Sequence, residues 1–152
     1  MLWKKTFVAL LIITLTASIV LLPGCTCNEE EPKDGDNITP VPSQVIEDIS
    51  ISEAFNLIQQ NQGNSDFVVL DVRTANEYNS GHIESAIMID FYTDTFEAEL
   101  SLLDKDKTYL IYCRSGNRSA QARDIMENLG FSVVYNMQGG FNDWVDEGYA
   151  TV

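Results

Sequence analysis

One short segment of the sequence combines a cysteine with two arginines and a glycine: Cys113-Arg114-Ser115-Gly116-Asn117-Arg118-Ser119. It stands between an apolar run that predicts a buried strand and a stretch with the apolar spacing of a helix. The free N–H groups and the dipole at a helix start favour a thiolate, as do neighbouring arginines, so we expect a lowered pKa for Cys113. Cys113 is therefore predicted to be a nucleophile that acts on a small anionic substrate.

The plainer interpretation of Cys113 is a small buried apolar side chain at the end of a strand, which describes most isolated cysteines. The segment around it is polar and contains a glycine. Arg114, Arg118 and Arg123 fall within eleven residues starting at Cys113, with no acid among them before Asp124. A locally positive loop on an otherwise acidic chain favours the nucleophile over the core residue.

The elements on both sides of this segment alternate between strand and helix. Short apolar runs predict strands at 67–70, 86–89, 109–112 and 133–135. Two capping boxes, Ser50 with Glu53 and Thr74 with Glu77, predict helix starts. Apolar stripes predict further helices at 96–103 and 122–129, and a short closing helix contains Trp144. This order predicts an α/β domain with a mainly parallel sheet, in which ligands bind where strands end, as at Cys113.

The first 24 residues have the pattern of an export signal. Two lysines precede a charge-free apolar run, and Leu22-Pro23-Gly24-Cys25 resembles a lipobox. Residues 1–24 are therefore predicted to be a lipoprotein-type signal peptide, and Cys25 is predicted to be lipidated. An uncleaved helical anchor is the alternative. Both interpretations predict an extracytoplasmic, membrane-anchored protein, because the lysines precede the apolar run.

A change in composition separates this leader from the folded part. Residues 25–48 are acidic, and all four prolines of the chain precede residue 43. High charge with few apolar groups cannot offset the entropy of ordering, so 25–48 is predicted to be a flexible tether. The folded domain is predicted to span 49–152.

Charge and ligand types narrow the partners. The chain has 9 Lys and Arg against 23 Asp and Glu, a formal net charge of −14, so we expect no nucleic-acid partner. His82 is the one histidine and there is no Cys-x-x-Cys pair, so no metal and no cofactor is predicted. If Cys25 is lipidated, Cys27 and Cys113 remain, and nothing in their spacing argues for a disulfide.

Four segments resemble those of rhodanese-like domains, in the same order and spacing. They are Asp71-Val72-Arg73 with Glu77-Tyr78, Gly81-His82-Ile83 with Ala86, Cys113 to Ser119, and Gly139-Gly140 with Trp144. The resemblance covers about residues 49–148. It implies one rhodanese-like domain with a five-stranded, mainly parallel sheet flanked by helices.

The resemblance also implies a two-step sulfur transfer. The thiolate of Cys113 attacks the outer sulfur of a donor such as thiosulfate and becomes a persulfide, and cyanide or a thiol then takes the sulfur. Backbone N–H groups of the loop cradle the persulfide, with Ser115, Gly116 and Asn117 shaping it, and Arg118 and Arg114 hold the sulfonate of the donor.

Five other residues are predicted to support the site: Asp71, Arg73, His82, Ser119 and Trp144. Asp71 and Arg73 suit a charge pair that orients loops better than a catalytic carboxylate and anion clamp. His82 invites a Cys-His dyad, but it follows Gly81 in a turn, which favours a hydrogen-bonding loop residue. Trp144 suits lid packing, although its edge could line the pocket.

Two other functions compete with sulfur transfer. A phosphatase of related fold has five residues between its Cys and Arg, whereas four separate Cys113 from Arg118, which makes the cradle narrower. A sensing module without turnover would not need Cys113. One version survives, in which the persulfide is an extracytoplasmic carrier state exchanged with a protein donor or acceptor.

Overall fold

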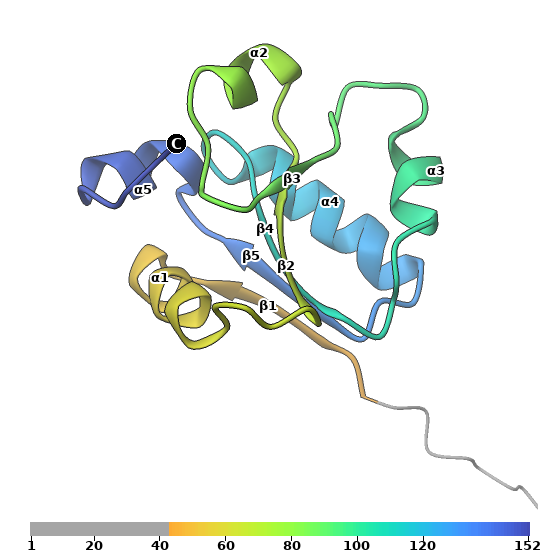
Figure 1. Ribbon diagram of the computed structural model, residues 1–152. Helices are drawn as coiled ribbons and strands as arrows, with labels where there is room; N and C mark the ends of the chain where they lie inside the picture. The colour runs from red at the N-terminus through yellow and green to blue at the C-terminus, as the bar shows by residue number, and fades with distance from the viewer. Residues whose placement is uncertain (1–42) are drawn as a thin grey trace, which may run out of the picture. The chain divides into compact units, whose positions relative to one another are not determined.

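A sheet forms the centre of the computed structural model, which describes residues 43–152 (Figure 1). Its five strands are all parallel and lie in the order β1-β5-β4-β2-β3. Their bounds are β1 Val45–Ile49, β2 Phe67–Asp71, β3 Ile87–Met88, β4 Thr108–Tyr112 and β5 Val133–Met137. The predicted α/β domain with a five-stranded parallel sheet is confirmed.

Helices cover both faces of this sheet (Figure 1). Their bounds are α1 Ile51–Gln60, α2 Ala75–Asn79, α3 Phe96–Ser101, α4 Asn117–Asn128 and α5 Gly140–Asp146. Successive strand residues point to opposite faces, so each strand contributes to two cores. Ile111 of β4 packs in the core with α3 and α4, and its neighbours Leu110 and Tyr112 pack in the core with α1 and α5.

Both predicted capping boxes are present. The Ser50 hydroxyl accepts from the Glu53 N–H at 3.3 Å, and the Glu53 carboxylate accepts from the Ser50 N–H at 2.8 Å. Thr74 and Glu77 form the same pair of bonds at 3.3 and 3.0 Å. These bonds satisfy N–H groups that have no partner inside the helix, and they fix where α1 and α2 begin.

Two predicted boundaries differ from the structure. Residues 45–48 were expected in the tether, but they lie in β1, which pairs with β5 from Val45↔Val133 to Ile49↔Met137. The acidic side chains of Glu47 and Asp48 are exposed, so their charge does not prevent pairing of the backbone. The strand predicted at 86–89 is shorter, because β3 pairs with β2 only at Ile87 and Met88.

Several predictions fall outside the described residues. These are the signal peptide at 1–24, the lipidation of Cys25 and the tether up to residue 42. Within residues 43–152, none of the helices combines the length and apolar character needed to cross a bilayer.

Candidate active site

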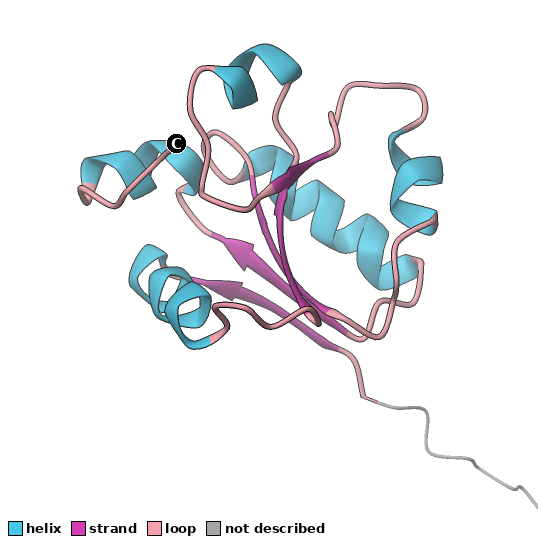
Figure 2. Cartoon of the chain, viewed as in Figure 1, coloured by secondary structure: helices cyan, strands magenta, loops and turns pink. Residues whose placement is uncertain are grey.

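Cys113 follows the last residue of β4 and opens the loop that leads into α4. Figure 2 shows that the strands run in the same direction. This loop therefore lies at the carboxyl ends of the strands, with α2 close by. Gly116, the residue before α4, has a φ of +92°, a conformation that side chains with a Cβ rarely adopt. The turn brings the Gly116 N–H to 3.2 Å from the sulfur of Cys113.

The thiol of Cys113 is enclosed by hydrogen-bond donors, and the residue is only 1% exposed. Burial raises the pKa of this thiol and is the largest single influence on it. Hydrogen bonds from the Ser119 hydroxyl and from the backbone N–H groups of Ser119, Ser115 and Arg118 together outweigh burial. The pKa of Cys113 is therefore held below its ordinary value, and the thiolate that a nucleophile needs is favoured.

Ser119 contributes from the first turn of α4. Its fully buried hydroxyl lies 3.5 Å from Sγ of Cys113 and 3.1 Å from the carbonyl oxygen of Gly116. A hydroxyl has one proton, so it donates to the sulfur or to the carbonyl, but not to both at full strength. Ser119 thus links the thiol to the turn that surrounds it.

Arg118 forms a two-pronged ion pair with Glu77 of α2. Nη1 and Nη2 of Arg118 each lie 2.8 Å from one carboxylate oxygen of Glu77. These hydrogen bonds are the main reason that the pKa of Glu77 falls from its ordinary 4.5 to about 2. They also raise the pKa of Arg118, and the thiolate of Cys113 adds to that rise. The pair ties the active-site loop to the cap of α2, because Glu77 also accepts from Thr74.

An exposed aromatic ring lies over the same arginine. The guanidinium carbon of Arg118 is 5.3 Å from the ring centre of Tyr92, which belongs to the segment between β3 and α3. Tyr92 is itself 69% exposed. Arg118 is therefore held between Glu77 and Tyr92, and its predicted contact with a donor sulfonate stays a prediction.

Arg114 is placed differently from Arg118. Arg114 is exposed, and its side chain forms no hydrogen bond and no ion pair within residues 43–152. Its predicted role in substrate binding is untested. The predicted local positive charge of the loop is thus distributed unevenly, since Arg118 pairs with Glu77 and Arg123 pairs with Asp48 and Asp124.

Asp71 and Arg73 form a buried ion pair beside the loop. Nε and Nη2 of Arg73 contact the carboxylate of Asp71 at distances from 2.7 to 3.0 Å, and Nη2 also donates to the Gly81 carbonyl at 2.6 Å. The Arg73 guanidinium lies 3.9 Å from the ring centre of Phe141. The pair joins the end of β2, the turn at Gly81 and α5.

His82 does not pair with the thiol. Its Nδ1 lies 3.1 Å from the carbonyl oxygen of Tyr78, and its ring stacks on Tyr78 at a centroid distance of 3.7 Å. Its backbone exchanges hydrogen bonds with Val152. No hydrogen bond between His82 and Cys113 is present in the described part of the chain, so the geometry supplies no Cys-His dyad.

The Gly139-Gly140 segment and the start of α5 bind the backbone of the active-site loop. The N–H of Phe141 donates to the Cys113 carbonyl at 2.7 Å, and the N–H of Asn142 donates to the Arg114 carbonyl at 3.0 Å. A Cβ on Gly140 would lie 2.5 Å from the Cys113 carbonyl oxygen, so only glycine permits this approach. The start of α5 therefore fixes the backbone on both sides of the thiol.

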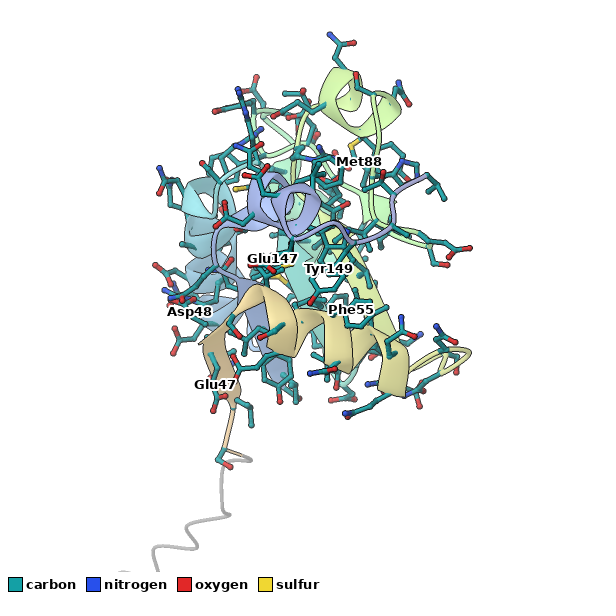
Figure 3. The ribbon with its side chains drawn as sticks, turned by 90° about the vertical axis from the view of Figure 1, so that its left-hand side faces the viewer. Glu47, Asp48, Phe55, Met88, Glu147 and Tyr149 are labelled. Carbon is teal, nitrogen blue, oxygen red and sulfur yellow. The ribbon has the colours of Figure 1, made fainter. Side chains whose placement is uncertain are left out.

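Trp144 lies in the core on the face of α1 and α5. Its Nε1 donates to the Ala150 carbonyl at 3.1 Å, and it is only 3% exposed. Phe55 of α1 and Tyr149 pack against it, and these two rings stack on each other (Figure 3). These contacts hold α5 against α1, and Trp144 does not line the pocket that Arg73, Glu77 and Arg114 border beside the loop.

Sequence reasoning did not assign three contacts of the site. Glu77 was predicted to form a capping box, but its ion pair with Arg118 was not predicted, although Glu77 is an acidic residue within one of the motifs. Gly140 was seen as part of a motif, without the contact to Cys113 that requires it. Tyr92 carried no signal, because its relation to Arg118 depends on the path of the β3–α3 segment.

The fold and the loop define a class: parallel α/β domains in which a cysteine between a strand and a helix is surrounded by backbone N–H groups. A model of the rhodanese-like domain family matches residues 54–147. The chain belongs to the rhodanese-like domain family.

Relatives of known sequence and structure agree with this assignment. A mitochondrial protein of Schizosaccharomyces pombe, provisionally named a thiosulfate sulfurtransferase, is 31% identical over 69% of this chain and 84% of its own length. A protein of Allochromatium vinosum named sulfurtransferase is 32% identical over 64% of this chain and 89% of its own. The crystal structure of a rhodanese-related protein from Thermoplasma volcanium aligns with a TM-score of 0.58 and 31% identity, over 70% of this chain and 97% of that chain.

Proposed function

We propose that this protein is a sulfurtransferase that carries sulfane sulfur as a persulfide on Cys113. The observation that carries the proposal is the cradle at Cys113, where a buried sulfur receives the Gly116 N–H at 3.2 Å beside the hydroxyl of Ser119. Donors aimed at sulfur stabilise a thiolate, and they also stabilise the anionic outer sulfur of a persulfide. The names of the Allochromatium and Schizosaccharomyces relatives support the same chemistry.

In the first half-reaction, thiosulfate is the proposed donor. The Cys113 thiolate attacks the outer sulfur of thiosulfate, a new S–S bond forms, and the old S–S bond breaks with its electron pair leaving on sulfite. Charge is conserved, because a thiolate and a dianion become a persulfide anion and a dianion. The hydrogen bonds that lower the pKa of Cys113 favour the thiolate that this step uses.

In the second half-reaction, a thiophilic acceptor such as cyanide or a thiolate attacks the outer sulfur of the persulfide. The S–S bond breaks and its electron pair returns to Sγ of Cys113. Because the backbone donors around Sγ serve both the thiolate and the persulfide, the loop needs no rearrangement between the two steps.

The proposed roles of the other residues follow from their contacts. The backbone of Ser115, Gly116 and Asn117 shapes the cradle, and Ser119 donates to sulfur. Arg114 contacts the sulfonate of the donor, and Arg118 adds positive charge near Cys113 while its Nη atoms hold Glu77. Asp71, Arg73, His82 and Trp144 keep the surrounding loops in place.

The test is sulfur loading followed by release. The purified, reduced protein is treated with thiosulfate, its intact mass is recorded, cyanide is added and thiocyanate is measured, with Cys113→Ala in parallel. We expect a gain of one sulfur atom that cyanide removes and that the variant lacks. A folded, fully reduced protein that takes up no sulfur would rule out thiosulfate as donor. A persulfide that no small acceptor discharges would favour a carrier that hands sulfur to a protein partner.

We further propose that the protein acts outside the cytoplasm, held at the membrane by a lipid on Cys25. The support is the leader pattern of residues 1–25 in the sequence. Cys25→Ala is expected to release the protein from membranes into the soluble fraction, and the intact mass of the mature protein shows whether cleavage precedes Cys25. Membrane retention of the variant with residues 1–24 still attached would support the uncleaved anchor instead.

A further inference from the structure

The first part of β2 has a neighbouring strand on one side only. β2 pairs with β4 along its whole length, but it pairs with β3 only at its last two residues, Leu70 and Asp71. Figure 1 shows the short strand β3 beside the far end of β2. In the described part of the chain, no strand pairs with residues 67–69 on the β3 side. These three residues form an open edge of the sheet.

The open edge presents backbone groups that have no partner. Successive residues of a strand direct their N–H and C=O groups to alternate sides. The Asp71 carbonyl accepts from the Ile89 N–H, so Asp71 faces the β3 side, and Val69 and Phe67 face the same way. The Phe67 N–H donates to the Asn64 carbonyl at 3.3 Å. The N–H of Val69 and the C=O of Phe67 have no backbone partner in the described part of the chain, and such groups are a template for another strand.

A pocket of about 730 Å³ follows the open edge. Phe67, Val68 and Val69 all line it, although consecutive side chains of a strand point to opposite faces of the sheet. The pocket therefore runs along the edge of the strand and not over one face. Phe55 and Ile58 of α1 form one wall, and the turn before β3 forms another.

The lining of the pocket determines what kind of segment fits. Phe55 and Ile58 are only partly buried, and Ile87 of β3 is 43% exposed, so apolar side chains of a ligand would cover apolar surface here. Glu84 is the one charged side chain among the described residues that line the pocket. A basic residue of a ligand would be attracted to this carboxylate, and an acidic residue would be repelled.

Other occupants fit the open edge less well. A two-fold dimer places the same surface of both copies together, and here that surface is hollow, so the walls of the pocket would keep the two β2 strands apart. A compact apolar ligand would cover the walls but would leave the N–H of Val69 and the C=O of Phe67 unpaired. An extended peptide supplies both the apolar side chains and the missing backbone partners.

We propose that the open edge of β2 is a docking site for an extended segment of another protein, which adds a short strand to the sheet. The backbone of this segment pairs with the free N–H and C=O groups of the open edge. Its apolar side chains cover Phe55 and Ile58, and a basic side chain faces Glu84. The proposal does not depend on the chemistry of Cys113, which does not line this pocket.

The test begins with a library of random peptides of about seven residues, enough to span the open edge at about 3.3 Å per residue. The library is displayed on phage and selected on the full chain. We expect enriched peptides that alternate apolar and polar residues and carry a lysine or an arginine. One enriched peptide is then synthesised, and its affinity for the full chain is measured by fluorescence anisotropy.

Two N-methylated versions of this peptide show whether its backbone pairs with the protein. Each version carries N-methyl groups at every second amide, and the two versions differ in which set of amides is blocked. In an added strand, only one set of N–H groups faces β2. We expect one version to bind about tenfold more weakly, as loss of a hydrogen bond implies, and the other to bind like the parent peptide.

A variant of the protein places the peptide at the open edge. Ile87→Lys puts a charge where the ladder between β2 and β3 ends, and we expect the affinity to fall about tenfold. Leu102→Lys is the matched control, because Leu102 is an apolar residue that is 87% exposed and lies outside the pocket. Its affinity should equal that of the wild type. Hydrogen exchange of residues 67–70 should slow when the peptide binds.

Three results would overturn the proposal. Equal affinity of the two N-methylated versions would indicate a pocket for apolar small molecules in place of strand addition. A loss of affinity in Leu102→Lys as large as in Ile87→Lys would place the peptide elsewhere. Failure to enrich any peptide, or self-association of the full chain that Ile87→Lys abolishes, would remove the partner segment, and the second outcome would assign the edge to another copy of the chain.

Discussion

The two sides of the active-site loop differ in how their arginines are held. On the Arg118 side, the arginine side chain is 12% exposed, and its guanidinium is bound at both Nη atoms by Glu77 and lies over the ring of Tyr92. On the other side, Arg114 is exposed and borders a pocket together with the buried Arg73. Only three residues lie between these two arginines, yet one is fixed by the protein and the other is available to a ligand.

This difference indicates a division of work within one short loop. An arginine that is already paired costs binding energy to release, so it suits a fixed electrostatic role near the thiolate. An arginine without an acidic partner loses only hydration and side-chain freedom when it binds an anion. Residue type alone does not separate these roles, whereas the presence of Glu77 does.

The largest expected effect comes from disrupting the backbone contact between Gly140 and the active-site loop, which carries both arginines. In Gly140→Ala, the new Cβ would lie 2.5 Å from the Cys113 carbonyl oxygen, at a residue with φ of +64°. We expect the free energy of unfolding to fall by about 2–4 kcal/mol through steric overlap and backbone strain, and sulfur loading to be lost. Urea unfolding and persulfide mass measure the two effects.

Gly148→Ala is the matched control for this change. Gly148 has a φ of +79°, but a Cβ there meets nothing within 4 Å. It should show the strain alone, about 1 kcal/mol, with normal sulfur loading. Equal losses of stability in both variants would show that the approach of Gly140 to the loop does not matter.

Glu77→Gln is expected to weaken the Arg118 side in a pH-dependent way. The pKa of Glu77 is lowered from 4.5 to about 2, mainly by Arg118, so the ionised form is more stable in the folded protein. That stability is complete above about pH 4.5 and is lost as the pH falls toward 2. After allowance for partial exposure, we expect the variant to be about 1–2 kcal/mol less stable at pH 6 and to approach the wild type near pH 2.5, as measured by urea unfolding.

Glu53→Gln is the control that separates the contribution of Arg118 to stability from the contribution of the helix cap. Glu53 closes the capping box of α1 as Glu77 closes that of α2, but its hydrogen bonds go only to Ser50. Its loss should therefore be smaller than that of Glu77→Gln at pH 6. If the two variants lose stability equally, Arg118 contributes nothing to the folded state.

The two loop arginines are compared directly by substituting each of them in turn. Arg118→Gln leaves the partly buried carboxylate of Glu77 without its partner and should lower the free energy of unfolding by about 1–2 kcal/mol. Arg114→Gln removes an exposed side chain and should change it by less than about 0.5 kcal/mol. Urea unfolding of both variants at pH 7 gives the comparison, and a loss in Arg114→Gln as large as in Arg118→Gln would remove the distinction between the two sides.

Local sequence patterns predicted the parts of the fold that local bonds create. The capping boxes at Ser50 and Thr74 were found because both partners lie within one helical turn. β1 was missed because it is an edge strand whose partners in β5 begin at Val133, and its own residues share the acidic composition of the preceding segment. Pairing over so long a separation leaves no local signal.

The site shows the same limit. Cys113 and its loop could be identified from residue types and spacing, since the strand, the glycine and the helix start are contiguous. Glu77 and Arg118 are 41 residues apart, and only the folded chain shows that they are paired. The contrast between Arg114 and Arg118 could not be predicted, because it depends on which acids the fold brings near each of them.

Ser119→Ala produces the smallest expected change and tests the thiol between the two sides. The Ser119 hydroxyl lies 3.5 Å from Sγ and is the largest of the influences that lower the pKa of Cys113. Without it, burial is opposed by fewer hydrogen bonds, so the pKa of Cys113 should rise. The rate of alkylation by iodoacetamide, measured against pH, should have its midpoint at higher pH than in the wild type.

Ser115→Ala is the control for this shift. Ser115 acts on the sulfur through its backbone N–H, which the substitution keeps, and its side chain is exposed. Its alkylation midpoint should therefore stay at the wild-type value. If Ser119→Ala also leaves the midpoint in place, the backbone N–H groups alone hold the thiolate, and the cradle works through the shape of the loop rather than through any side chain in it.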